Sequence, residues 1–349
     1  MSDIDVAVYV DVANLAHNGG YGMKFDVLRE FACRGESNPV RLNAYVGYDA
    51  ERAQRDNIYR ESQQNFYALL RDFGYKVIEK TVKWYVDDTG NKFGKANVDL
   101  DLGVDALTQS DRMNRVLLAT GDGDFVQVVR ALQNKGCRVE IIAFENVSND
   151  LKREADLFMS GFLIPNLLPI QSPAPLISWG ATGSRVRGVC THFELGKKQF
   201  GFMRYLEKIS PDIFKIDARQ VGSPYKTVFF HATKLPHDFD VTIIPNRNSI
   251  FEFELIVGTE GMQAANIQLI SGPGKKTHPL PPVSTPSSVP SVAPSTAPLT
   301  PSASLPVLVP AASPPPVRTS TVRTRVGTPA SKIKSPPSVV PPPPELPKT

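Results

Sequence analysis

The last 79 residues of this chain limit what the rest of it can fold into. Residues 271–349 contain 22 of the 31 prolines and no Phe, Tyr or Trp. A proline-rich segment without aromatic residues cannot bury enough apolar surface to offset the entropy lost on ordering. We therefore expect a disordered Pro/Ser-rich tail over 271–349, and we expect any packed core to lie within residues 1–270.

The tail also carries the positive charge of the chain. It holds eight Lys or Arg residues and one Glu, a net charge of +7, whereas the whole chain has +4, so residues 1–270 are net negative. A basic, proline-rich arm could dock a protein partner or attract nucleic acid weakly. A solvated tail without a partner is the alternative.

The first residues and the cysteines indicate the compartment. Residues 1–5 are acidic and precede no apolar signal region, and no apolar run approaches the roughly eighteen residues of a membrane span. Cys33, Cys137 and Cys190 are far apart, which favours buried thiols over disulfides or a zinc site. We expect a soluble, cytoplasmic protein with no membrane contact, and a homo-oligomer remains open.

Residues 1–165 alternate between strand and helix patterns. Continuous apolar runs typical of buried parallel strands occur at 6–10, 40–46, 76–78, 116–119 and 138–144. Helical patterns lie between them at 57–73, 98–107 and 125–135, the first with Ile58, Phe66, Leu69 and Leu70 near one face. This order predicts an α/β fold with a doubly wound parallel sheet.

The rest of the folded part has a different character. Prolines and glycines cluster in residues 166–185, which we interpret as a linker. Residues 186–270 contain short alternating strand patterns without long helices, which predicts a small β-barrel of the OB type.

Acidic residues follow the predicted strands. Asp11 and Asn14 come after the first strand, Asp122 and Asp124 after the strand at 116–119, and Asp99 begins a helix. Each one has a plain alternative as a turn or N-cap residue. Together they would meet at the carboxyl edge of the sheet, where carboxylates repel one another unless a cation compensates. A hard divalent ion, Mg²⁺ or Mn²⁺, is the natural compensation.

Such a metal site suits phosphodiester hydrolysis. The motifs contain no His or Cys, which argues against zinc and against a covalent cysteine or Ser-His mechanism. No phosphate loop of the GxxxxGK[ST] type is present, which disfavours a P-loop NTPase. A haloacid-dehalogenase-like phosphatase would need a second Asp at the position of Ala13.

Three motifs in order resemble a known family. They are "VYVDVANL" (8–15), "KANVD" (95–99) and "TGDGDF" (120–125), and they look like the motifs of LabA-like NYN domains in the PIN-like nuclease superfamily. The resemblance implies a metal-dependent ribonuclease with metal ligands Asp11, Asp99, Asp122 and Asp124, and with Asn14 positioning a water, ligand or loop. Asp105 would be an outer neighbour of the metal, and Asp101, on the same helical face, would point to solvent.

Residues 80–92 predict a hairpin that carries interleaved basic and aromatic residues. Lys83, Lys92 and Lys95 could hold phosphates, with Trp84 or Tyr85 as a stacking face. A half-buried edge hairpin without a ligand is the alternative.

The predicted barrel resembles a cold-shock domain. The residues that carry this resemblance are "KQFGFM" (198–203), "VFFH" (228–231) and "GMQAANI" (261–267). It implies that single-stranded bases stack on Phe200, Phe202, Phe229 and His231, with Lys198 near phosphate. The chain departs from the family where His192 replaces a customary tryptophan and Gln199 a glycine.

The sequence therefore predicts a two-domain RNA-processing enzyme. It would be a metal-dependent ribonuclease acting on single-stranded RNA, with the cold-shock-like barrel holding the substrate. The alternative is a non-catalytic RNA-binding regulator built on a nuclease-like fold.

Overall fold

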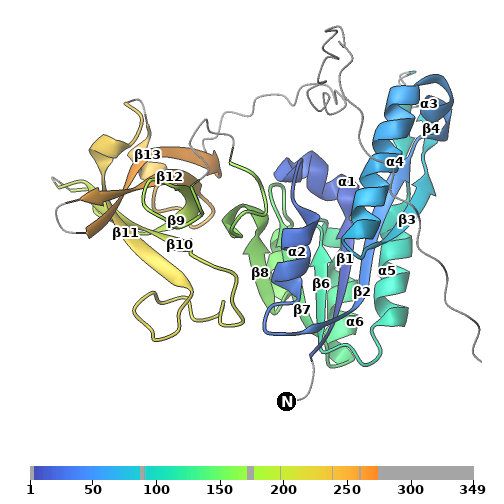
Figure 1. Cartoon of the computed structure of the whole chain (residues 1–349), viewed down its shortest axis with the longest axis horizontal. Coiled ribbons are helices and arrows are strands. Elements are labelled where there is room, and N and C mark those ends of the chain that lie inside the picture. Colours follow the sequence, from blue (N-terminus) through green and yellow to red (C-terminus); the bar gives the residue numbers. More distant parts are fainter. Residues whose placement is uncertain are drawn as a thin grey trace, which may run out of the picture. The chain divides into compact units, whose positions relative to one another are not determined.

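A computed structural model gives the fold of the chain (Figure 1). It describes residues 4–86, 90, 92–170, 177–196, 198–237, 239–258 and 261–273, and only the backbone of Lys92, Phe93 and Lys95. The predicted tail, from residue 274 onward, and most of the proline cluster of the linker lie outside these residues.

The amino-terminal part is a six-stranded sheet in the order β3-β2-β1-β6-β7-β8, and every neighbouring pair is parallel. The central strand β1 is almost entirely buried, as its unbroken apolar sequence requires. The strands are β1 (Asp5–Asp11), β2 (Asn38–Tyr48), β3 (Lys76–Thr81), β6 (Arg115–Ala119), β7 (Arg138–Ala143) and β8 (Leu157–Ser160). The predicted doubly wound sheet is confirmed.

Helices cover both faces of this sheet (Figure 1). One apolar core packs α2 and α4 against β1 through Val8, Leu28 and Leu70, and a second packs α5 and α6 through Tyr9 and Leu102. The helices are α1 (Val12–Leu15), α2 (Phe25–Ala32), α3 (Ala50–Arg55), α4 (Asn57–Asp72), α5 (Val98–Gln109), α6 (Val126–Asn134) and α7 (Asn149–Glu154). Short turns occur at η1 (Ala16–Gly20), η2 (Gly123–Phe125) and η3 (Gly161–Leu163).

The predicted apolar face of α4 was wrong in part. Leu70 is fully buried, but Leu69 is 46% exposed and Ile58 is 71% exposed. Leu69 lies about 100° around the helix from Leu70, which puts it at the margin of the buried face rather than at its centre. By the same geometry Ile58 lies roughly 120° around the helix from Leu70.

The amino edge of the sheet is held by a buried ionic cluster around Glu140. Its carboxylate accepts hydrogen bonds from Arg34 at 2.6 Å and Arg138 at 3.0 Å, with Arg115 at 3.6 Å. Burial opposes ionisation of this group, but Arg34 and the neighbouring guanidinium groups hold the pKa of Glu140 below its ordinary value. The cluster therefore holds the amino ends of β6 and β7, opposite to the carboxyl ends of the strands, which the motif acids follow.

The second part is a closed five-stranded barrel in the order β10-β11-β13-β12-β9, as predicted. Its core contains Met203, Phe230, Phe251 and Phe253. The strands are β9 (Arg185–Phe193), β10 (Phe200–Leu206), β11 (Tyr225–His231), β12 (Ile250–Gly258) and β13 (Gly261–Ser271), with short turns η4 (Ala232–Lys234) and η5 (Val241–Ile243). In the part of the chain that the structure describes, no helix is long and apolar enough to cross a membrane.

Candidate active site and nucleic-acid interface

Three chain segments bring the motif acids to one edge of the sheet. Asp11 is the last residue of β1, and Asp122 follows the end of the neighbouring strand β6 by three residues. Asp99 lies in the first turn of α5. In parallel sheets ligands bind beyond the carboxyl ends of the strands, so the fold puts these carboxylates where a ligand would bind.

Asp11 is the buried member of this group. Asp11 is only 3% exposed, and its carboxylate accepts a hydrogen bond from the backbone N–H of Asn14 at 2.9 Å. Burial raises the pKa of Asp11 to about 6, and the charges of Asp99 and Asp122 add to the rise, whereas the Asn14 hydrogen bond opposes it. Asp11, Asp99 and Asp122 therefore repel one another electrostatically and would together attract a cation.

The acids of the third motif lie on a short turn after β6. The Asp122 carboxylate accepts from the backbone N–H of Asp124 at 3.0 Å and caps the turn η2. Asp124 is exposed. The capping role expected as the plain alternative is thus present at Asp122, as it is at Asp11, and it fixes each carboxylate close to the sheet edge.

Asn14 holds the loop that carries Asp122. Its side-chain oxygen accepts from the backbone N–H of Gly121 at 2.9 Å. The same loop is held from the other side, where the backbone N–H of Ser148 donates to the Gly121 carbonyl at 3.0 Å. Asn18 donates to the Asn14 carbonyl at 2.7 Å, which ties the turn η1 into this arrangement. Of the roles considered for Asn14, the contacts support that of a loop anchor.

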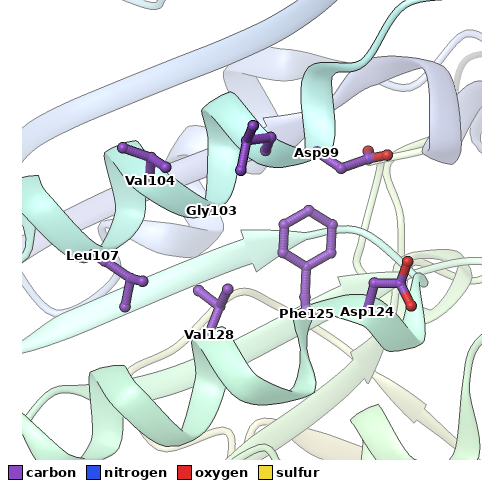
Figure 2. Close-up of a pocket in the computed structure, with 8 residues that line it drawn as sticks. Asp99, Gly103, Val104, Leu107, Asp124, Phe125 and Val128 are labelled. Carbon is purple, nitrogen blue, oxygen red and sulfur yellow. The ribbon is translucent and has the colours of Figure 1, made fainter.

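Asp99 and Asp124 face each other across a groove (Figure 2). Figure 2 shows the two carboxylates at one end of this groove, with the Phe125 ring between the segments that carry them. Behind them the lining is apolar and includes Val104, Leu107 and Val128.

The other two acids of α5 have protein partners. The Asp105 carboxylate accepts from the hydroxyl of the fully buried Tyr45 at 2.8 Å, so it anchors the helix to β2. Asp101 is not simply solvent-facing as expected, because it forms an ion pair with Lys80 at the end of β3. Both contacts help to fix α5, and with it Asp99.

The predicted hairpin before Asp99 is confirmed as β4 (Lys83–Val86) paired with β5 (Lys92–Lys95). Trp84 and Tyr85 are each 47% exposed, so both rings remain accessible. Lys95 lies in β5 opposite Lys83, and its side chain is outside the described residues.

The outer face of the barrel carries an aromatic cluster. The Phe229 ring lies 5.8 Å from Phe200 and 6.0 Å from Phe202, centroid to centroid, and all three are partly exposed. His231 is the cross-strand neighbour of Phe200 on β11. The alternate residues point inward, because Met203 and Phe230 are buried in the core.

The flanking residues complete this face. His192 on β9 lies 6.4 Å from the Phe202 ring, and Lys198 is exposed in the turn before β10. Gln199 adopts a φ of 41°, a left-handed conformation that glycine takes without strain.

The acid cluster fits a hard divalent cation by its chemistry. All atoms that could bind the ion are carboxylate oxygens, and the buried Asp11 interacts electrostatically with Asp99 and Asp122. Among the described residues, no group of three or more His, Cys, Asp or Glu side chains is close enough to hold one ion. Mg²⁺ is usually bound through one or two carboxylates and keeps several waters, so a protein cage of three ligands is not required.

Sequence reasoning did not single out Gly103 or Tyr45. Gly103 lines the groove from the middle of α5, and Tyr45 holds Asp105. A glycine inside a helical pattern is itself a signal, because it costs helix stability and calls for a packing or functional reason. The hydroxyl of Tyr45 gave no comparable signal, since its sequence context indicates only a buried strand.

Comparison with known proteins identifies a domain family that the amino-terminal part resembles. The family model "NYN domain" matches residues 5–167, which confirms the NYN resemblance for this part of the chain. The match covers slightly less than half of the chain and shows similarity to NYN domains, which are placed in the PIN-like nuclease superfamily.

The chain is 25% identical over 181 residues to the low amplitude and bright protein LabA of Synechococcus elongatus, a match that covers 50% of this chain and 92% of that protein. A crystal structure of a protein of unknown function from Vibrio parahaemolyticus matches with a TM-score of 0.36 and 24% identity, over 45% of this chain and 93% of that one.

Proposed function

We propose that this chain is a metal-dependent ribonuclease that hydrolyses phosphodiester bonds of single-stranded RNA. The observation that carries the proposal is the buried carboxylate of Asp11, which shares the carboxyl edge of an NYN-domain sheet with Asp99 and Asp122. Buried carboxylates that repel one another are costly unless a cation or a catalytic task accounts for them.

Of Asp11, Asp99, Asp122 and Asp124, one or two would bind the ion directly, and the others would bind it through waters that the ion keeps. When bound, Mg²⁺ or Mn²⁺ supplies charge neutralisation at the phosphate and lowers the pKa of a bound water. Asn14 keeps the Gly121–Asp124 loop in place, and Asp105 and Asp101 fix the helix that carries Asp99. Residues 1–165 would thus be the catalytic domain, joined by a linker at 166–185.

Residues 186–270 would bind the RNA strand. The partly exposed rings of Phe200, Phe202 and Phe229 offer stacking surfaces, and every base has a face that can stack on them. His231, Lys198 and Lys95 would add contacts to the strand, the two lysines to its phosphates.

Substitution of one acid tests the proposal. We would incubate the purified full-length wild type and Asp122→Asn with end-labelled single-stranded RNA in Mg²⁺, in Mn²⁺ and in EDTA. We expect metal-dependent cleavage by the wild type and a loss of roughly 100-fold or more in the variant, with RNA affinity retained. Asp72→Asn, which removes the same charge from the exposed end of α4, serves as the matched control. Equal cleavage by wild type and Asp122→Asn would contradict the nuclease assignment.

The second candidate function is that of a non-catalytic RNA-binding regulator. It is favoured by one observation. The adjoining rings of Phe200, Phe202 and Phe229 all belong to the barrel, so this stacking surface includes none of the motif acids. Binding of RNA without cleavage in every metal condition would support this function over hydrolysis.

A further inference from the structure

The groove beside Asp99 and Asp124 has a larger apolar part than a metal site needs. Its volume is about 290 Å³, and its lining consists of Asp99, Leu100, Gly103, Val104, Leu107, Asp124, Phe125 and Val128. Leu100 is 64% exposed and Val104 is 49% exposed, although both are large apolar side chains on a regular helix. Apolar side chains left open to water beside a polar site indicate a ligand with an apolar face.

Gly103 gives independent support for a ligand. It lies inside α5, where glycine costs about 1 kcal/mol relative to alanine. Packing does not demand this cost, because a Cβ added at Gly103 would meet only Val128 Cγ2, at an ordinary contact distance of 3.5 Å. The missing side chain keeps the groove open between α5 and α6 (Figure 2).

We propose that this groove receives one nucleobase of the RNA, the base next to the phosphodiester held at the carboxylates. The proposal rests on the proposed ribonuclease function and deepens it. Because Asp99 and Asp124 belong both to the groove and to the acid site, a strand with its phosphate at the acids has an adjacent base within reach of the groove.

The lining also indicates how the base is recognised. Apart from the two carboxylates at its end, the groove presents aliphatic and aromatic carbon. Such a surface accepts the face of any base and has no donors or acceptors to read a base edge. The groove would therefore require a base without selecting which one.

A nucleobase fits better than the other occupants of an apolar groove. A stable interface with a second copy or a folded partner takes roughly 20–30 residues from each side, whereas the eight residues named above line this groove. An acidic partner would be repelled by Asp99 and Asp124. Two occupants remain as alternatives, a partner protein with a basic surface and a second copy of this chain, and the experiments below distinguish them from a base.

The first experiment changes the groove and the RNA together. We would compare the full-length wild type, Gly103→Ala and Leu100→Ser on one oligoribonucleotide, intact or with a single abasic nucleotide beside the cleaved bond. Thr108→Ala is the matched control, because it makes a small change at an exposed position of the same helix outside the groove. Gly103→Ala fills the groove floor while it strengthens the helix, so a loss of activity cannot be attributed to unfolding.

We expect Gly103→Ala and Leu100→Ser to lower kcat/KM for intact RNA by roughly ten-fold, and Thr108→Ala to leave it unchanged. On the abasic RNA the wild type and both groove variants should cleave at the same reduced rate, since no base remains to enter the groove. An equal fold-loss on intact and abasic RNA would overturn the proposal.

The second experiment does not depend on cleavage. RNA carrying 4-thiouridine would be irradiated with the full-length protein in EDTA, and the cross-linked peptides identified by mass spectrometry. We expect cross-links in residues 98–109 or 125–134 that fall in Gly103→Ala and persist in Thr108→Ala. Cross-links confined to other residues would overturn the proposal. It would also be overturned if the molecular mass in solution showed that the wild type is an oligomer and that Leu100→Ser dissociates it, because a second copy would then occupy the groove. Cross-linking in the groove without cleavage would reject the ribonuclease and retain the base site.

Discussion

The side-chain oxygen of Asn14 accepts a hydrogen bond from the backbone N–H of Gly121 at 2.9 Å, across 107 residues of sequence. This contact joins the first motif to the third, because Asp11 lies three residues before Asn14 and Asp122 directly follows Gly121. One amide therefore sets the separation between two segments that each carry a carboxylate.

Asn14 is predicted to act as a positioning residue. Asn14→Ala removes the acceptor and leaves the loop free to move, so we expect kcat to fall by roughly ten-fold or more while the affinity for RNA changes little. Asn14→Asp keeps an acceptor oxygen for Gly121 and should restore part of the lost kcat. Steady-state kinetics separates kcat from KM, and a change confined to KM would contradict the positioning role.

Asp11 is predicted to destabilise the fold at neutral pH. Its pKa in the folded protein, about 6, is above the ordinary value of 3.8, so the folded state binds the extra proton between these values. The free energy of unfolding should therefore fall as the pH rises from about 4 to 6, by an amount on the order of 3 kcal/mol, and stay low above pH 6.

Asp11→Asn removes this titration, and its amide oxygen can still accept from the Asn14 N–H. In EDTA we expect the variant to be more stable than the wild type by about 1–3 kcal/mol at pH 7.5 and no more stable near pH 3.5. With Mg²⁺ or Mn²⁺ present, the variant should not cleave RNA. Urea unfolding at both pH values measures the difference. A wild type that is more stable than the variant at pH 7.5 would show that the charged carboxylate does not destabilise the folded state at that pH.

Phe229 and Phe230 are predicted to have separate roles although they are adjacent. Phe229 faces outward beside Phe200 and Phe202, whereas Phe230 is 1% exposed in the barrel core. We expect Phe229→Ala to weaken RNA binding by about 1–3 kcal/mol with little loss of stability. Phe230→Ala should instead cost about 3–5 kcal/mol of stability. Fluorescence anisotropy with labelled RNA and thermal unfolding distinguish the two, and similar effects on affinity would argue against the outward stacking surface.

Gln199 is predicted to carry local backbone strain. Its φ of 41° lies in the left-handed region, and its carbonyl accepts from the N–H of Ala232 at 2.8 Å, so the conformation is held in place. Gln199→Gly should stabilise the protein by up to about 1 kcal/mol, and the β-branched Gln199→Val should destabilise it by about 1–2 kcal/mol. Chemical unfolding of the full chain would rank the three proteins, and the reverse order would exclude strain at this position.

Much of the fold was predictable because buried parallel strands have unmistakable sequences. The run at 6–10 is apolar throughout, and it became the central strand. The edge strand β8, Leu157–Ser160, was not predicted, because its sequence LFMS contains no β-branched residue and suits a helix as well as a strand. The error at Leu69 has a different origin, because Leu69 lies at the margin of the apolar face and a sequence pattern does not show where that margin falls.

The candidate site was predictable to the extent that topology alone determines it. Acids that follow parallel strands reach the same edge, so Asp11 and Asp122 could be placed together from the sequence. The hydrogen bond from Gly121 to Asn14 and the groove at Gly103 depend on distances between segments remote in sequence, which no local pattern encodes.

The ionic cluster around Glu140 lies at the amino ends of β6 and β7, and the motif acids lie at the carboxyl ends of β1 and β6. Rigidity and chemistry therefore occupy opposite rims of one sheet, on different sets of side chains. A lineage carrying this architecture could lose or retune its reaction by substitutions in the loops after the strands while the scaffold survives unchanged. Persistence of the fold among descendants would then be poor evidence for persistence of the activity, and the acids themselves would have to be inspected in each one.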